Sequence, residues 1–264
     1  ASDITESKYI GATGTGVNNR TDNFTLTLPA NSAFVNGLLY VPYTADFTPA
    51  GYPVFNMTFN GADISDKILG KYRDKTNLGA SDYGKKYYGV LIYDVSGLIK
   101  DGNNTLVLIK ANGTNVAVYP TILIGLYNTT NSTVLSDIYI LNGADQLTKS
   151  SYNKAGRLVN VTNKVDLDAG KMQNAYWYVF ESGGTSGRGD LVFNDKLYSN
   201  VWNGTDYNLV QYYVADVSDL IKDSNIVSFV ATGSGITALQ QIFVVETALF
   251  NLNLPAEITT GETS

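Results

Sequence analysis

The chain has 264 residues, a formal net charge of −6, and only 16% charged residues against 44% hydrophobic ones. An acidic chain lacks the basic surface that binds nucleic acid or anionic lipid, and it contains no apolar run of about 18 residues that would span a bilayer as a helix. Histidine and cysteine are both absent, which excludes imidazole catalysis, disulfides, thiol chemistry and thiolate metal sites.

Residues that favour strands and turns dominate the composition. Tyr (19 residues) and Gly (25 residues) are abundant, and short apolar or alternating stretches lie between Gly, Asn and Asp turns. Such alternation is typical of the strands of a β-sandwich, and no long stretch has the 3.6-residue period of a helix. The sequence therefore predicts an all-β protein.

Taken in chain order, the first strand-like stretch is NFTLTLPAN, within an N-terminal extension that covers residues 2–31. A strand that has no partner in its own unit can complete the sheet of another copy, as in donor-strand filaments. We therefore expect residues 2–31 to be available to a neighbouring copy.

An internal repeat organises the rest of the chain. The strand-like stretches of the first half are NGLLYV, NMTFNGADIS, YYGVLIY and TILIGLYN, with DVSGLIKDGNN after the third. The second half repeats this order with NAYWYV, GDLVFNDKLYS, LVQYYVA and VVETALFN, and with DVSDLIKDSNI after the third. Self-similarity of this kind is the signature of a duplicated unit. The sequence predicts two tandem jelly-roll-like β-sandwich units related by internal duplication.

The repeat also sets the predicted boundaries. The first unit, with its N-terminal extension, covers residues 1–131, the second covers 132–254, and a polar C-terminal tail follows at 255–264. Because the connecting segment TTNST is short, we expect the two units to pack against each other.

Each DVS motif is predicted to begin a single helical turn before the next strand. Ser96 and Ser218 are placed to cap these turns. The apolar residues that follow, LI in both motifs, are then expected to close the edge of a sandwich core.

Over much of its length the chain resembles a known group of surface proteins. The stretch YDVSGLIKDGNNTLVLIK is similar to the jelly-roll modules that accompany many glycosidases. The order of YYGVLIYDVSGLI, YPTILIGLYN and the NGAD of Asn142–Asp145 resembles the β-sandwich domains of methanogen surface and adhesin-like proteins. This resemblance implies an archaeal envelope location and an adhesive or structural role, and it supplies no catalytic residues.

Nine Asn-x-Ser/Thr triplets are acceptor motifs for N-linked glycans, which attach to exposed positions of secreted proteins. The excess of these motifs over chance favours an extracellular glycoprotein. The predicted glycosylation sites are Asn19, Asn23, Asn56, Asn103, Asn112, Asn128, Asn131, Asn160 and Asn203.

Calcium is the cofactor that best suits an acidic chain without His or Cys, because it binds carboxylate and carbonyl oxygens in loops. The densest group of such oxygens in the first unit comes from Asn60, Asp63 and Asp66. We therefore expect any metal site to lie there, and we expect no other cofactor.

Aromatic side chains are candidates for sugar binding, because their rings stack on sugars as well as filling cores. Trp202, in SNVWNGTDY, lies in a turn-rich stretch and is predicted to be the most exposed of them. It is the candidate sugar-binding residue, although a glycan on the neighbouring Asn203 would compete with a ligand.

These observations predict a non-enzymatic protein of the cell surface. The primary hypothesis is an extracellular structural or adhesive glycoprotein that assembles with identical copies into a surface layer, sheath or filament, or that mediates contact with another cell or its surface glycans. One alternative is a carbohydrate-binding module. Another is a viral jelly-roll coat component, because a coat and a surface layer need the same two-sheet unit.

Overall fold

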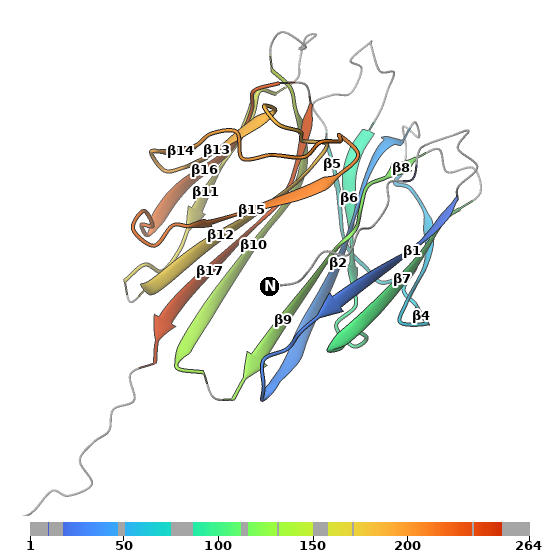
Figure 1. Ribbon diagram of the computed structural model, residues 1–264, viewed down its shortest axis with the longest axis horizontal. Helices are drawn as coiled ribbons and strands as arrows, with labels where there is room; N and C mark the ends of the chain where they lie inside the picture. Colours follow the sequence, from blue (N-terminus) through green and yellow to red (C-terminus); the bar gives the residue numbers. More distant parts are fainter. Residues whose placement is uncertain are drawn as a thin grey trace, which may run out of the picture.

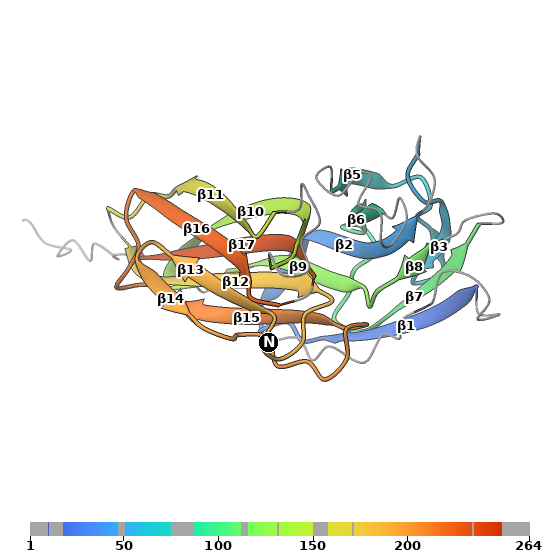
Figure 2. The same ribbon diagram turned by 90° about the horizontal axis from the view of Figure 1, so that it is seen from above.

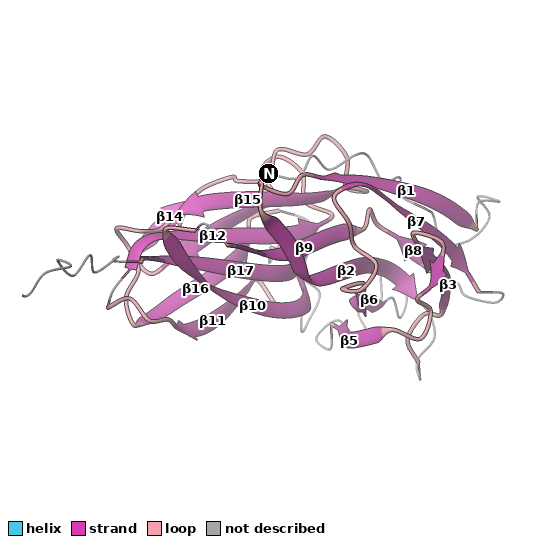
Figure 3. Cartoon of the chain, turned by 90° about the horizontal axis from the view of Figure 1, so that it is seen from below, coloured by secondary structure: helices cyan, strands magenta, loops and turns pink. Residues whose placement is uncertain are grey.

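The computed structural model describes residue 10 and residues 18–46, 51–74, 87–111, 116–130, 132–149, 158–170, 172–233 and 235–249. Within these ranges every regular element is a β-strand, and paired strands are antiparallel (Figure 3). The all-β prediction is therefore confirmed. Over the same ranges, no helix with the length and apolar character needed to cross a membrane is found.

The first unit consists of two sheets. Its outer sheet has the order β1-β7-β3-β4, formed by β1 (Asn19–Leu26), β7 (Gly102–Lys110), β3 (Phe55–Phe59) and β4 (Ala62–Asp63). Its inner sheet has the order β5-β6-β2-β8, with β9 also paired to β2, and is formed by β5 (Ile68–Arg73), β6 (Tyr87–Asp94), β2 (Ser32–Asp46), β8 (Ala117–Val118) and β9 (Ile122–Thr129).

The second unit has the same two-sheet design. Its outer sheet has the order β11-β16-β13-β14, formed by β11 (Asn160–Asp166), β16 (Ser224–Ala231), β13 (Gly189–Phe193) and β14 (Lys196–Tyr198). Its inner sheet has the order β10-β17-β12-β15, formed by β10 (Val134–Leu147), β17 (Ile236–Ala248), β12 (Met172–Ser182) and β15 (Val210–Asp216). The chain passes from one unit to the other between β9 and β10.

Five strand pairings recur in the two units. The pairs β1–β7, β7–β3, β3–β4, β2–β6 and β2–β9 of the first unit correspond to β11–β16, β16–β13, β13–β14, β12–β15 and β12–β17 of the second. The units differ at the edges of their inner sheets, where β5 lies beside β6 in the first and β10 lies beside β17 in the second. Equivalent pairings agree with a duplicated unit, and the duplication itself stays a prediction.

The strand registers support three of the four matched sequence blocks and correct the fourth. In the first unit Leu38 pairs with Ile124, and its counterpart Tyr176 pairs with Val244. The equivalent of TILIGLYN is therefore the stretch that begins three residues before VVETALFN. The apolar pattern of consecutive branched residues cannot distinguish these alternatives, because only pairing with the neighbouring strand sets the register.

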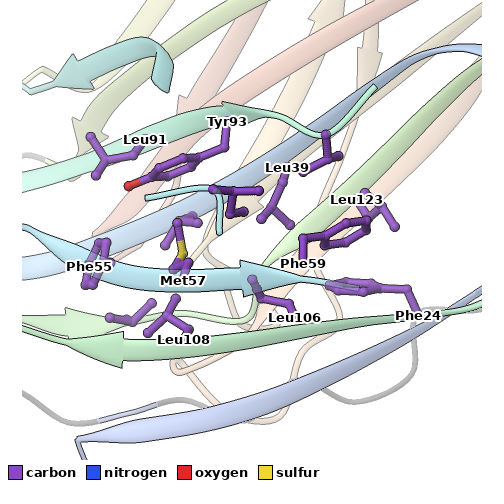
Figure 4. Close-up of a cluster of buried hydrophobic side chains, with 14 of the residues drawn as sticks. Phe24, Leu39, Phe55, Met57, Phe59, Leu91, Tyr93, Leu106, Leu108 and Leu123 are labelled. Atoms are coloured by element: carbon purple, nitrogen blue, oxygen red, sulfur yellow. The ribbon is translucent and has the colours of Figure 1, made fainter. Parts of the chain in front are cut away.

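Alternation along the strands builds a separate core in each unit. In β3, Phe55, Met57 and Phe59 are buried and the residues between them face outward. These side chains meet Leu106 and Leu108 of β7 and the inner-sheet side chains of β2 and β6 (Figure 4). The second core is richer in aromatic rings, because Trp177 stacks on Phe243 with ring centroids 6.2 Å apart and also contacts Phe193.

A third apolar cluster lies between the two inner sheets and joins the units. Tyr40, Val90 and Ile92 of the first unit pack there against Phe180 and Ile242 of the second. The Tyr40 hydroxyl also donates a hydrogen bond of 3.0 Å to Oδ1 of Asn142. Figures 1 and 2 show the two units side by side, with their inner sheets facing each other.

The donor-strand expectation for residues 2–31 is wrong for the stretch that contains NFTLTL. This stretch is β1, which pairs over its whole length with β7 of the same chain. Its buried residues Phe24 and Leu26 belong to the first core, so pairing within the unit satisfies both the backbone and the apolar side chains. Apart from Ile10, residues 1–17 lie outside the described ranges, and so does the predicted tail 255–264.

Each DVS motif does form one helical turn, but the capping residue differs from the prediction. The amides of Leu98 and Ile99 both donate to the carbonyl of Val95. The side chain that caps this turn is Asp94, whose Oδ1 accepts from the amide of Ser96 at 2.9 Å. Asp216 does the same for Ser218. The two serine hydroxyls instead accept hydrogen bonds from inner-strand amides, and so tie each turn to its sheet.

Candidate functional site

The outward side of the inner sheet of the second unit carries a group of tyrosines. Successive side chains of a strand alternate between faces, so the residues beside Trp177 in β12 point away from the core that contains Trp177. Neighbouring positions of β15 and β17 extend this surface by strand pairing. We call it the tyrosine face, and it consists of Asn174, Tyr176, Tyr178, Tyr212, Val214, Asp216 and Glu246.

The tyrosine face begins where the contact between the units ends. Tyr178 is half-buried and packs at the margin of the cluster between the inner sheets. Tyr212 is 49% exposed, and its ring stacks on buried Phe180 with centroids 5.9 Å apart. Tyr127 of β9 in the first unit, which is 48% exposed, borders the face. Tyr212 and Tyr127 are thus open to solvent, and the Tyr212 ring is also held by packing on Phe180.

The phenol of Tyr178 lies near titratable groups of both units. Burial raises the pKa of the Tyr178 phenol, and the nearby side chains of Tyr176, Glu246, Tyr127 and Tyr212 raise it further. The contribution of Tyr127 is informative, because this residue comes from the first unit. The group of phenols therefore spans the junction of the two sandwiches.

Polar groups lie at one end of the tyrosine face. Nδ2 of Asn174 donates a hydrogen bond of 3.0 Å to Oε2 of Glu246. No Lys or Arg occurs in the strands that form or border this surface, namely β9, β10, β12, β15 and β17. The face therefore offers aromatic rings, hydroxyl groups, one amide and negative charge.

The corresponding surface of the first unit is covered, and it is aliphatic at two positions of β6. Counting back from the shared DVS motif, Val90 occupies the place of Tyr212 and Ile92 the place of Val214, and the strand registers agree. Val90 is 1% exposed and Ile92 is 3% exposed, because both pack against the second unit. The position of Tyr212 thus holds an aliphatic residue in the first unit, whereas Tyr178 corresponds to a tyrosine, Tyr40, that is fully buried.

A buried carboxyl group lies near the other end of β12. The Glu181 side chain is fully enclosed, and Oε2 accepts from the amide of Gly184 at 2.7 Å while Oε1 accepts from Nε2 of Gln211 at 2.9 Å. Oε1 of Gln211 in turn accepts from the amides of Asn203 and Gly204. Burial raises the pKa of Glu181 to about 8. The two side chains hold two loops of the second unit together, and the carboxyl group of Glu181 is buried.

The predicted glycosylation sites that the structure describes are all exposed, and four of them lie on the outer sheet of the first unit. Oδ1 of Asn103 accepts a hydrogen bond from the hydroxyl of Thr25, and Oδ1 of Asn23 accepts one from Thr105. Neither of these bonds uses Nδ2, the nitrogen that carries an N-linked glycan. The described sites are Asn19, Asn23, Asn56, Asn103, Asn128, Asn160 and Asn203, while Asn112 and Asn131 lie outside the described residues.

The residues of the predicted calcium site are engaged in turns. Asn60 has a left-handed backbone (φ 50°), and its side chain bonds to the Leu98 carbonyl, the Asn104 side chain and the Thr105 amide at 2.9 Å each. Asp63 accepts two hydrogen bonds from Ser65, which lower the pKa of its carboxyl. Asp66 is exposed.

This arrangement gives Asn60 a structural role, and calcium binding at Asn60, Asp63 and Asp66 stays a prediction. Asn194 of the second unit has the same backbone conformation (φ 51°) and the equivalent three bonds, to Leu220, Asn225 and Ile226. Among the residues described, no group of three or more Asp or Glu side chains is placed to hold a metal ion.

The predicted exposure of Trp202 is wrong. Trp202 is 1% exposed and stacks on Phe229 with ring centroids 6.4 Å apart, so it cannot offer a surface to a sugar. The turn-forming residues around Trp202 predict that the backbone lies at the surface. The large apolar ring is more stable when it is buried at the end of the second core than when it is exposed to water. The neighbouring Asn203 is exposed.

The aromatic candidate chosen from the sequence was Trp202, and sequence reasoning missed Tyr127, Tyr176 and Tyr178. A signal was present in NAYWYV, where the two tyrosines flank a tryptophan and so share the face opposite to it. The alternation in NAYWYV does not indicate which side of the strand is covered by other parts of the protein.

Comparison with protein families gives a match over most of the chain. A family model described as "Protein of unknown function (DUF3344)" matches residues 1–246. None of the curated proteins compared with the sequence matches it.

Comparison with solved structures gives distant likenesses. A peptide-N(4)-(N-acetyl-β-D-glucosaminyl) asparagine amidase is 13% identical, with 94% of this chain and 96% of that chain covered and a TM-score of 0.34. The α-L-rhamnosidase of Streptomyces avermitilis is 15% identical, with 92% and 26% covered and a TM-score of 0.25. The major capsid protein P2 of bacteriophage PM2 is 10% identical, with 92% and 98% covered and a TM-score of 0.23. Likenesses at these scores carry no argument about function.

Proposed function

The chain belongs to the family described as "Protein of unknown function (DUF3344)", and we propose that it is an extracellular cell-surface glycoprotein with a structural or adhesive role. In this proposal the protein is not an enzyme. It assembles with identical copies or mediates contact with another cell, and the resemblance to methanogen surface proteins implies an archaeal envelope.

The placement of the glycosylation motifs carries the proposal. All seven described acceptor residues are exposed, and Asn19, Asn23, Asn56 and Asn103 share the outer sheet of the first unit. A glycan needs an acceptor that points to solvent, and the strands β1, β3 and β7 alternate so that Asn and Thr face outward over an apolar core. The outer sheet of the second unit carries one such residue, Asn160, so glycans would cover mainly one side of the molecule.

The chemistry of the chain supports a role in binding or structure. Without His or Cys, catalysis would depend on carboxyl groups. Glu181 is the one buried glutamate among the residues described, and its oxygens bond to the surrounding loops in an enclosed site.

The outer sheets support assembly with identical copies. β1 ends the outer sheet of the first unit and β11 ends that of the second, and both are strands of seven or eight residues at a sheet edge. A strand at an edge presents backbone groups that pair readily with another strand. Edge pairing between copies would extend the sheets without changing either core.

Intact mass spectrometry of protein purified from its native source tests the proposal. We expect masses above the 28.6 kDa of the polypeptide, and we expect Asn23→Gln to remove the mass of one glycan when the gene is expressed in its own host. Asn163, which is not in an acceptor motif, gives a matched control as Asn163→Gln. A native protein with the unmodified polypeptide mass would contradict the proposal.

A further inference from the structure

We propose that the tyrosine face is a binding site for a neutral oligosaccharide. This inference adds a ligand to the adhesive role proposed above. It depends on a different surface from the glycosylation motifs and is tested with protein that carries no glycans, so the two proposals can fail separately.

The tyrosine rings of the face combine exposure to solvent with a fixed position. A ring that binds a sugar must be exposed at its face or edge and yet held in position, because ordering a free side chain on binding costs entropy. Tyr212 meets both conditions, since it is 49% exposed and stacks on Phe180. Tyr178 is half-buried and is held by packing against the apolar cluster between the units.

The tyrosines of the face are spaced along one strand and across to the next. Tyr176 and Tyr178 are two residues apart on β12 and therefore stand about 7 Å apart on one face. Tyr212 lies on the next strand, where its partner in the register is Phe180. The rings thus form a row along and across the strands, which suits an extended chain of sugar rings better than a single small molecule.

The charge of the tyrosine face is negative. The strands of the face contain no Lys or Arg, and its charged members are Glu246, which bonds to Asn174, and Asp216. A carboxylate and an amide accept and donate hydrogen bonds to sugar hydroxyl groups, while the negative charge repels acidic polysaccharides and nucleic acid. These properties favour a neutral ligand rich in hydroxyl groups.

Two positions of the face differ in exposure from their equivalents in the first unit. There, these positions hold Val90 and Ile92. Both are aliphatic residues, as suits a permanent contact between units, and the second unit covers them. In the second unit the same positions hold Tyr212 and Val214, which are 49% and 39% exposed. Tyrosine is suited to a surface that is sometimes wet and sometimes covered, because its ring is apolar and its hydroxyl is polar.

The experiment is a calorimetric titration of unglycosylated recombinant protein with neutral hexasaccharides of glucose, N-acetylglucosamine, mannose and xylose, and with polygalacturonate. We expect at least one neutral hexasaccharide to bind and polygalacturonate not to bind. Tyr212→Ala should weaken binding by about three- to tenfold, because one aromatic stacking contact has this magnitude. Tyr212→Phe keeps the ring and should stay within about twofold of the wild type.

Tyr52→Ala is the matched control, because Tyr52 is a 38% exposed tyrosine of the first unit whose ring lies against Lys71 and Arg73. It should bind as the wild type does, and thermal melting of each variant verifies that it is folded. The proposal is overturned if no neutral hexasaccharide binds, if Tyr52→Ala and Tyr212→Ala lose binding equally, or if Tyr212→Ala abolishes a self-association of the wild-type protein without changing sugar binding.

Discussion

The inner sheets of the two sandwiches share the pairings of their central strands and differ in what covers their outward sides. On the outward side of the first unit's inner sheet, Val90 and Ile92 are buried in the cluster between the units. The inner sheet of the second unit is covered over only part of its outward side, and it carries tyrosines where the cover ends. A repeated strand pattern thus fixes the fold of a unit, while the neighbouring unit determines what each face can do.

The largest expected effect comes from placing a charge on the covered face. Ile92→Asp buries a carboxylate without a partner and should reduce the free energy of unfolding by on the order of 4 kcal/mol. Val214→Asp, at the equivalent exposed position, should cost less than about 1 kcal/mol. Urea denaturation of both variants measures the contrast, and equal losses would show that the two faces do not differ in cover.

The second effect concerns Glu181, which has no counterpart in the first unit, where the equivalent position of the repeat holds Tyr43. The pKa of Glu181 is about 8 in the folded protein and is raised by burial from an ordinary value of 4.5, so the folded state holds the proton more strongly. The stability gained from the protonated group is complete below about pH 4.5 and is lost as the pH rises through about 8.

Glu181→Gln tests this dependence, because the amide keeps the shape of the side chain and does not titrate. Between pH 5 and pH 9 the wild type should lose a few kilocalories per mole of stability relative to the variant, since each pKa unit corresponds to about 1.4 kcal/mol. The measurement is the free energy of unfolding in denaturant at both pH values. Parallel pH profiles for the two proteins would contradict the assignment.

The third prediction tests whether the units are equivalent in detail. Asn60→Ala and Asn194→Ala each remove three side-chain hydrogen bonds and leave alanine in a left-handed conformation. Each should therefore cost about 2 to 3 kcal/mol, and the two costs should agree within about 1 kcal/mol. Melting of each variant in the presence and absence of calcium also tests the metal prediction, because binding at Asn60 would make only the Asn60 variant less responsive to calcium.

The smallest effect is expected from truncation on the two equivalent faces. Val90→Ala should cost about 2 kcal/mol, because the cavity forms within the contact between the units. Tyr212→Ala should cost about 1 kcal/mol or less, because half of its side chain is already exposed. Chemical denaturation resolves this difference, and a larger loss for Tyr212→Ala would mean that the tyrosine face is part of the core.

Much of the fold could be predicted from the chain. The alternation in FNMTF and NAYWYV identifies buried and outward residues, and the repeated DVS turn identifies equivalent strands. Less of the candidate site could be predicted. Trp202 was expected at the surface because its neighbours favour turns, and the structure buries it, since flanking residues describe the backbone path and not the direction of a large ring.

The sequence by itself determined the strand content, the two-sheet units and the absence of imidazole and thiol chemistry, because these depend on residue type and on the two-residue period of a strand. It did not determine the register of β17 against β12, the cap at Asp94, or the difference between Val90 and Tyr212. Those depend on contacts between segments far apart in the chain, and only the packed units decide which outward face is covered and which stays in water.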